Sequence, residues 1–168
     1  MRRILPVLLI GLGALLVLGP VGWLYFDSLV SHPAVVPLPE EIAGLQITEH
    51  DTGAQAAAEF KKLHGKKFPL TSGAMGIYGN HQITVWAAGT PLSFMASQMI
   101  DAMKDKIAAG NSPFIPMTEI NDQDRIVYVL EGMGQRHYYF QSKNLVIWLA
   151  ADPTVADEAL QQTLEAFP

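Results

Sequence analysis

Three histidines occupy positions where an imidazole could bind a ligand or transfer a proton. His64 closes an expected helix, His81 lies in an expected hairpin turn, and His137 begins the aromatic run 137–140. The helix dipole favours a histidine in the last turn of a helix, and a histidine in a turn is commonly solvated. His137 is the more informative residue, because strand alternation places it on the same sheet face as Tyr139.

The strand that carries His137 is our first choice for a binding surface. The sheet face turned away from the helices is exposed unless a partner covers it, and exposed aromatic side chains are typical of interfaces. The candidate binding residues are therefore His64, Arg136, His137 and Tyr139.

No catalytic or metal-binding signature accompanies these candidates, and we assign neither catalytic residues, nor metal ligands, nor a cofactor. The histidines lack the spacing of a zinc site, and no carboxylate stands at ligand spacing from them. No serine occupies a Gly-x-Ser-x-Gly turn, and no glycine-rich phosphate loop is present. The chain contains no cysteine, which excludes thiol nucleophiles, thiolate ligands and disulfides.

Two further sets of residues have both a functional and a structural interpretation. Met95, Met99 and Met103 could offer thioether ligands to copper, but their spacing of four is also that of a buried helix face. Trp86 and Trp148 could form an aromatic cage or serve as core anchors. The structural interpretation is favoured for both sets.

The two tryptophans belong to an internal repeat. Residues 78–91 align without gaps on residues 140–153, with an aromatic residue eight positions before the tryptophan and a proline five positions after it. Each copy continues into an amphipathic segment. This pattern predicts two β-hairpin–helix repeats.

The pattern along the whole domain predicts an α+β fold. Helices are expected from Thr52 to Gly65, from Thr90 to Gly110 and from Asp152 onward, with Thr90 and Asp152 as N-caps. An antiparallel sheet with about three helices packed mainly on one face is the expected architecture. The expected strands are 45–48, 74–78, 82–88, 115–120, 125–131, 135–141 and 145–150.

The N-terminus predicts a membrane anchor. Residues 4–26 carry no charged side chain and would span about 34 Å as a helix. Arg2 and Arg3 precede this run and Asp27 follows it, which favours a cytoplasmic N-terminus and a domain outside the cytoplasm. A cleaved signal peptide is the alternative, but its apolar region is normally shorter and ends in a small-residue cleavage site. The expected organisation is an anchor in 1–27, a proline-rich spacer in 28–41 and a domain in 42–168.

Composition narrows the function without identifying it. The formal net charge is −5, and Arg2 and Arg3 precede the apolar run, so the domain is more acidic still. Such a domain does not suit nucleic acid. We expect a single-pass membrane protein with a non-catalytic extracytoplasmic domain that binds or assists an envelope protein partner. A metal- or cofactor-handling envelope protein and an envelope hydrolase are the alternatives.

Overall fold

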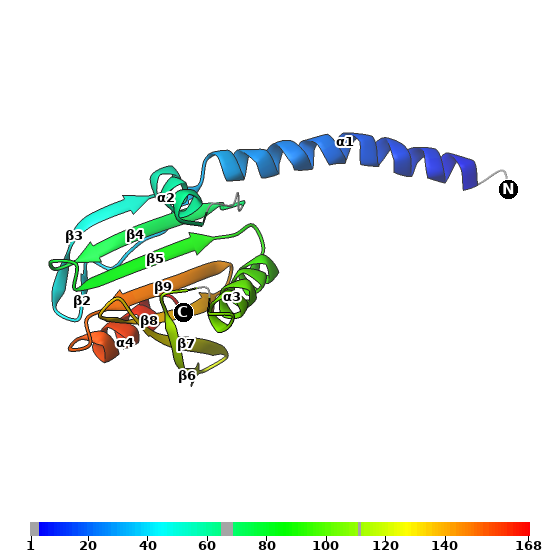
Figure 1. Ribbon diagram of the computed structural model, residues 1–168. Coiled ribbons are helices and arrows are strands. Elements are labelled where there is room, and N and C mark those ends of the chain that lie inside the picture. The colour runs from blue at the N-terminus through cyan, green and yellow to red at the C-terminus, as the bar shows by residue number, and fades with distance from the viewer. Residues whose placement is uncertain (1–3, 65–68, 111) are drawn as a thin grey trace.

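The structure is a computed structural model that describes residues 4–64, 69–110 and 112–168, with the side chains of residues 4–6, 61, 63 and 64 outside the description. A long helix projects from a folded α+β domain (Figure 1). The helices are α1 (Ile4–Ser31), α2 (Ala54–His64), α3 (Ser93–Ala108) and α4 (Ala156–Ala166). The strands are β1 (Ala34–Val35), β2 (Glu41–Ile42), β3 (Leu45–Thr52), β4 (Ser72–Tyr78), β5 (Ile83–Gly89), β6 (Ile115–Asp122), β7 (Arg125–Gly132), β8 (Gln135–Ser142) and β9 (Leu145–Ala151).

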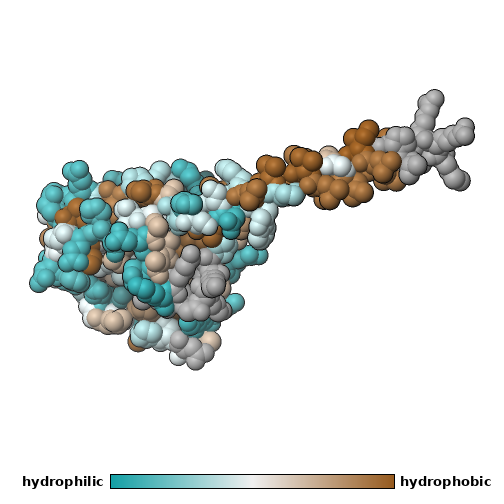
Figure 2. All heavy atoms as spheres, turned by 90° about the horizontal axis from the view of Figure 1, so that it is seen from above, coloured by the Kyte–Doolittle hydropathy of each residue, from teal (hydrophilic) through white to brown (hydrophobic). Residues whose placement is uncertain are grey.

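Helix α1 is long and apolar enough to span a membrane. The apolar window of Val7–Ser31 is not buried inside the molecule, and Figure 2 shows the helix as an apolar rod beside a domain of mixed surface polarity. A signal sequence near the N-terminus passes the same test of length and composition. Pro20 lies inside the helix, where a membrane environment tolerates it.

The strands form one sheet in the order β2-β3-β4-β5-β9-β8-β7-β6. Every pair in this order is antiparallel, and β1 adds a parallel pairing to β4. The seven strands expected from the sequence are all present. Strand β8 lies between β9 and β7, so both of its edges are paired.

Helices cover both faces of the sheet. Trp86 and Ala88 of β5 pack toward α2 and α3, whereas Val85 and Ala87 pack into the core that contains α4. Successive side chains of β5 therefore point to opposite faces of the sheet, one covered by α2 and α3 and the other by α4. The expectation that the helices pack mainly on one face is wrong for α4, because both faces of the central strands are apolar and each needs a cover.

The segment expected to be a spacer is partly built into the domain. Ala34 and Val35 pair with Ser72 and Gly73 of β4, and Val36 is only 5% exposed. Tyr78 donates a hydrogen bond from its hydroxyl to the Pro39 carbonyl at 2.9 Å. Two residues separate the end of α1 from the start of β1. The domain consequently begins close to the end of the apolar helix.

Helices α3 and α4 begin later than Thr90 and Asp152 predict. The Thr90 amide donates to the Asn144 carbonyl at 2.9 Å, and the Asp152 amide donates to the Gln82 carbonyl at 2.8 Å. These bonds continue the β5–β9 pairing into both proline turns. The first helical residues are Ser93 and Ala156, and neither helix has a side-chain cap.

Candidate functional site

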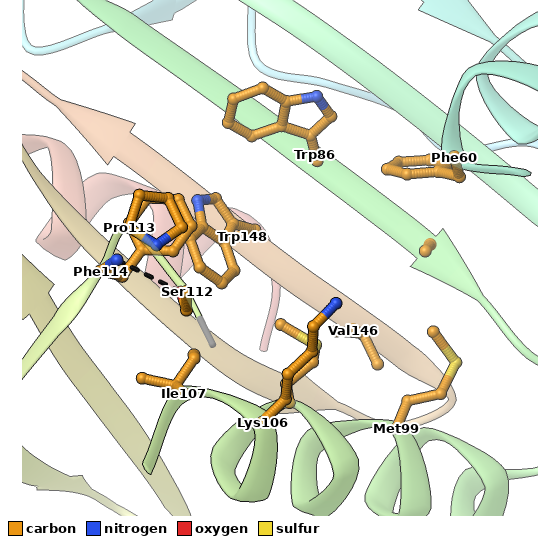
Figure 3. Close-up of a pocket in the computed structure, with 12 residues that line it drawn as sticks. Phe60, Trp86, Met99, Lys106, Ile107, Ser112, Pro113, Phe114, Val146 and Trp148 are labelled. Carbon is orange, nitrogen blue, oxygen red and sulfur yellow. Dashed lines mark hydrogen bonds between the residues drawn. The ribbon is translucent and has the colours of Figure 1, made fainter. Parts of the chain in front are cut away.

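A pocket of about 350 Å³ opens between α2 and α3 above the centre of the sheet (Figure 3). Its base is formed by Trp86 of β5 and Trp148 of β9, which stand directly opposite each other in the antiparallel register. The walls come from α2, α3 and the segment that leads into β6. The lining residues are Phe60, Trp86, Ala88, Met99, Met103, Lys106, Ile107, Ser112, Pro113, Phe114, Val146 and Trp148.

Among the described residues, the pocket lining is almost entirely apolar and has one charged group. Lys106 is exposed in the last turn of α3, and Figure 3 shows its amine pointing away from α3 toward Trp86 and Phe60. Among the described residues, no carboxylate forms an ion pair with Lys106, whereas Lys104 on the same helix pairs with Glu119 at 2.9 Å. No Asp or Glu belongs to the lining in the part of the chain that the structure describes.

Trp148 is held in place from beneath the pocket. Its indole N–H donates to Nδ1 of His137 at 3.2 Å, and Nε2 of His137 lies 3.0 Å from the Gly132 carbonyl. These partners require a neutral imidazole that carries its proton on Nε2. His137 is 4% exposed, and burial lowers its pKa from the usual 6.5. The ring of Phe114 packs against both His137 and Trp148.

A row of aromatic rings continues from Trp148 across the sheet. Tyr139 of β8 stacks on Trp148 with ring centroids 5.5 Å apart, and Tyr128 of β7 stacks on Tyr139 at 4.7 Å. The amine of Lys104 lies 4.9 Å above the Tyr128 ring. The base of the pocket is therefore one end of a rigid aromatic layer, which fixes its shape before any ligand arrives.

The three candidate binding residues whose side chains the structure describes do not share one surface. The His137 and Tyr139 side chains are buried under α3 rather than exposed, since both faces of β8 are covered. Arg136 points to the opposite face, where it pairs with Asp157 of α4 at 3.1 Å. His64 ends α2, and its side chain lies outside the described residues. A binding role for these four residues stays a prediction.

A second, polar groove runs between α3 and the turns of the distal strands. It contains carboxylates of Asp101, Asp122 and Asp124 together with Arg125 and Lys143. Asp122 is already paired with Arg125 at 2.8 Å. No group of three or more potential metal ligands occurs in the described ranges. The described part of the groove thus offers mixed charges and no cluster of metal ligands.

Sequence reasoning named the pocket residues but interpreted them as core. Trp86 and Trp148 are half-buried, and so are Met99 and Met103. The fully buried positions of α3 are instead Ala96, Ile100 and Ile107. The aligned tryptophans, each followed by an amphipathic helix, were the signal that could have located the pocket. The contribution of Phe60 and Phe114 had no comparable signal.

Comparison of the chain with protein-family models, curated proteins and solved structures gives no significant match.

Proposed function

We propose that this protein is a single-pass membrane protein whose extracytoplasmic domain binds an apolar ligand in the α2–α3 pocket and performs no catalysis of its own. The observation that carries the proposal is the preformed pocket. It is lined by Trp86, Trp148 and aliphatic or aromatic neighbours, and its volume of about 350 Å³ lies within the range of ligand sites. Lys106 is the charged group in the described part of its lining.

The anchor and its orientation are part of the same proposal. The apolar length of α1 supports a membrane span. Arg2 and Arg3 before the span favour a cytoplasmic N-terminus and a domain on the other side of the membrane. An envelope protein partner stays a prediction, which co-purification of the full chain in mild detergent can test.

Quenching of tryptophan fluorescence tests the pocket. The full chain carrying Trp23→Phe is placed in zwitterionic lipid nanodiscs, so that emission comes from Trp86 and Trp148. A neutral bromoalkyl alcohol is then added, because a bromine atom in the pocket quenches both indoles. We expect quenching that saturates as probe is added, in place of the linear rise that collisional quenching gives. Ala88→Leu should abolish it by filling the base of the pocket, since Ala88 lies in the lining.

Ala54→Leu provides the matched control, because residue 54 is exposed and lies outside the pocket lining. It adds the same apolar volume and should leave the quenching unchanged. Absence of saturable quenching, or equal quenching in Ala88→Leu, would contradict the proposal.

We also infer that the β4–β5 and β8–β9 hairpins are copies of one unit. The β5–β9 register supports this, because Ile83 pairs with Ala151 just as Leu145 pairs with Gly89 around the Trp86–Trp148 pair. The amide bonds of Thr90 and Asp152 are matched in the same way. Helices α3 and α4 lie on opposite faces, so the inferred copy is limited to the hairpins and their proline turns.

A further inference from the structure

We propose that the pocket ligand is a single-chain anionic amphiphile from the bilayer, with its tail on Trp86 and Trp148 and its head group at Lys106. This inference rests on the proposed function and names the class of ligand. Three observations lead to it: the distribution of polarity in the pocket, the size and rigidity of its base, and its position near the end of α1.

The polarity of the pocket is one-sided. Besides Lys106, the described lining contains one hydroxyl side chain, Ser112, whose oxygen already accepts a hydrogen bond from the Phe114 amide at 3.2 Å. The Lys106 amine is thus the one cation offered to a ligand by the described lining, and no lining carboxylate competes for it. An apolar body with one negative end satisfies both features. A cationic head group would meet repulsion at Lys106.

The size and shape favour one chain. A volume of about 350 Å³ lies near the lower end of the range of roughly 300–1,000 Å³ for ligand sites, which leaves no room for two acyl chains. Trp148 is fixed by His137 and by stacking on Tyr139. Met99 and Met103 are flexible and can follow the contour of a chain. A rigid aromatic base with adaptable thioether walls fits a linear tail.

The position of the pocket favours the bilayer as the source. Helix α1 ends at Ser31, and Val35 already pairs with Gly73 of β4. Gly73 lies under α2, where an added Cβ would be 3.5 Å from the Phe60 ring. Phe60 in turn lines the pocket. The wall formed by α2 therefore packs on β4, which pairs with β1. Strand β1 begins shortly after the end of α1.

The test compares three bromoalkyl probes of one chain length, with carboxylate, alcohol and ammonium head groups. Binding is measured by quenching in the Trp23→Phe protein in zwitterionic nanodiscs, with partitioning corrected from nanodiscs that lack protein. We expect the carboxylate to bind most tightly and the ammonium most weakly. Lys106→Gln should weaken carboxylate binding by about 2- to 5-fold, as for a partly exposed ion pair, and leave alcohol binding unchanged. Added salt should reduce the difference.

Lys104→Gln is the matched control, because Lys104 lies on the same helix but pairs with Glu119 outside the pocket lining. It should change none of the three affinities. Equal affinities for carboxylate and alcohol, or a Lys106→Gln variant that binds the carboxylate normally, would overturn the anionic ligand and leave an apolar pocket in place. Failure of all three probes to quench would overturn the proposed function as well.

Discussion

The hydrogen-bond chain beneath the pocket makes stability depend on pH in a defined direction. His137 accepts from the Trp148 indole N–H through Nδ1, so protonation of this nitrogen breaks the bond and places a charge in a site that is 4% exposed. Burial accordingly lowers the pKa of His137 in the folded protein. The unfolded chain then binds a proton more readily than the folded one. Stability contributed by neutral His137 is full above pH 6.5 and falls as pH drops from there toward the lower folded pKa.

The size of this effect has an upper limit. One group contributes at most about 1.4 kcal/mol to the free energy of unfolding per pH unit. Between pH 7.5 and pH 5.5, protonation of His137 can therefore lower the free energy of unfolding by at most about 1.4 kcal/mol. The reason is that its pKa in the unfolded chain, 6.5, lies one unit above pH 5.5. A domain of this length loses roughly 3–5 °C in melting temperature for each kcal/mol. His137→Phe should remove the pH dependence. It should also cost about 1–3 kcal/mol at pH 7.5, since the Trp148 N–H loses its acceptor.

Thermal unfolding of the full chain, followed by near-ultraviolet circular dichroism between pH 5.5 and pH 7.5, measures both effects. His50→Gln is the matched control, because His50 is exposed on β3 and should retain the slope of the parent protein. The reasoning is refuted if His137→Phe keeps the parent slope, or if the parent protein becomes more stable as pH falls through this range.

Three further substitutions test the contacts that hold the C-terminal end of α4, the segment around Pro39, and α2. Arg125→Met should lower the free energy of unfolding by about 2 kcal/mol in chemical denaturation, because the guanidinium donates to the carbonyl of Leu164 in α4 and to that of Phe167 just after it; an unchanged midpoint would contradict this. Tyr78→Phe should cost about 1 kcal/mol and speed hydrogen exchange around Pro39, since it removes their hydrogen bond, and unaltered exchange would speak against it. Gly73→Ala should cost about 1–3 kcal/mol in thermal melts, because the new Cβ would lie 3.3 Å from that of Ala56; wild-type stability would show that α2 can move without cost.

Local patterns were sufficient for the elements of the domain. Alternating apolar residues and short turns placed six of the seven long strands within about two residues, because burial alternates along a strand. Strand β3 runs from Leu45 to Thr52, four residues past its expected end at residue 48. The apolar run before Asp27 predicted the long helix for a similar reason, although α1 continues to Ser31. The predicted first residues of α3 and α4 were less accurate, because these helices begin at Ser93 and Ala156. The amides of Thr90 and Asp152 bond to distant carbonyls, a competition that no local cap signal reveals.

The binding candidates show where sequence reasoning ends. Alternation correctly separated His137 and Tyr139 from Phe140, but it could not say that β8 lies between two strands with helices on both faces. Exposure of a strand is a property of the sheet order and of its covering layers. Both depend on contacts between residues far apart in the chain.

The sequence by itself determined a charge-free helix long enough for a membrane, an acidic α+β domain without cysteine, and two aligned tryptophans that each precede a helix. Only the tertiary structure shows that these tryptophans lie at the base of a pocket. Pairing of β5 with β9 sets Trp86 opposite Trp148, and α2 and α3 cover that face without filling the space above the pair. A pocket is the volume that packing leaves open, so its existence depends on the positions of several elements at once. The position of Lys106 beside that volume is likewise a property of the tertiary structure.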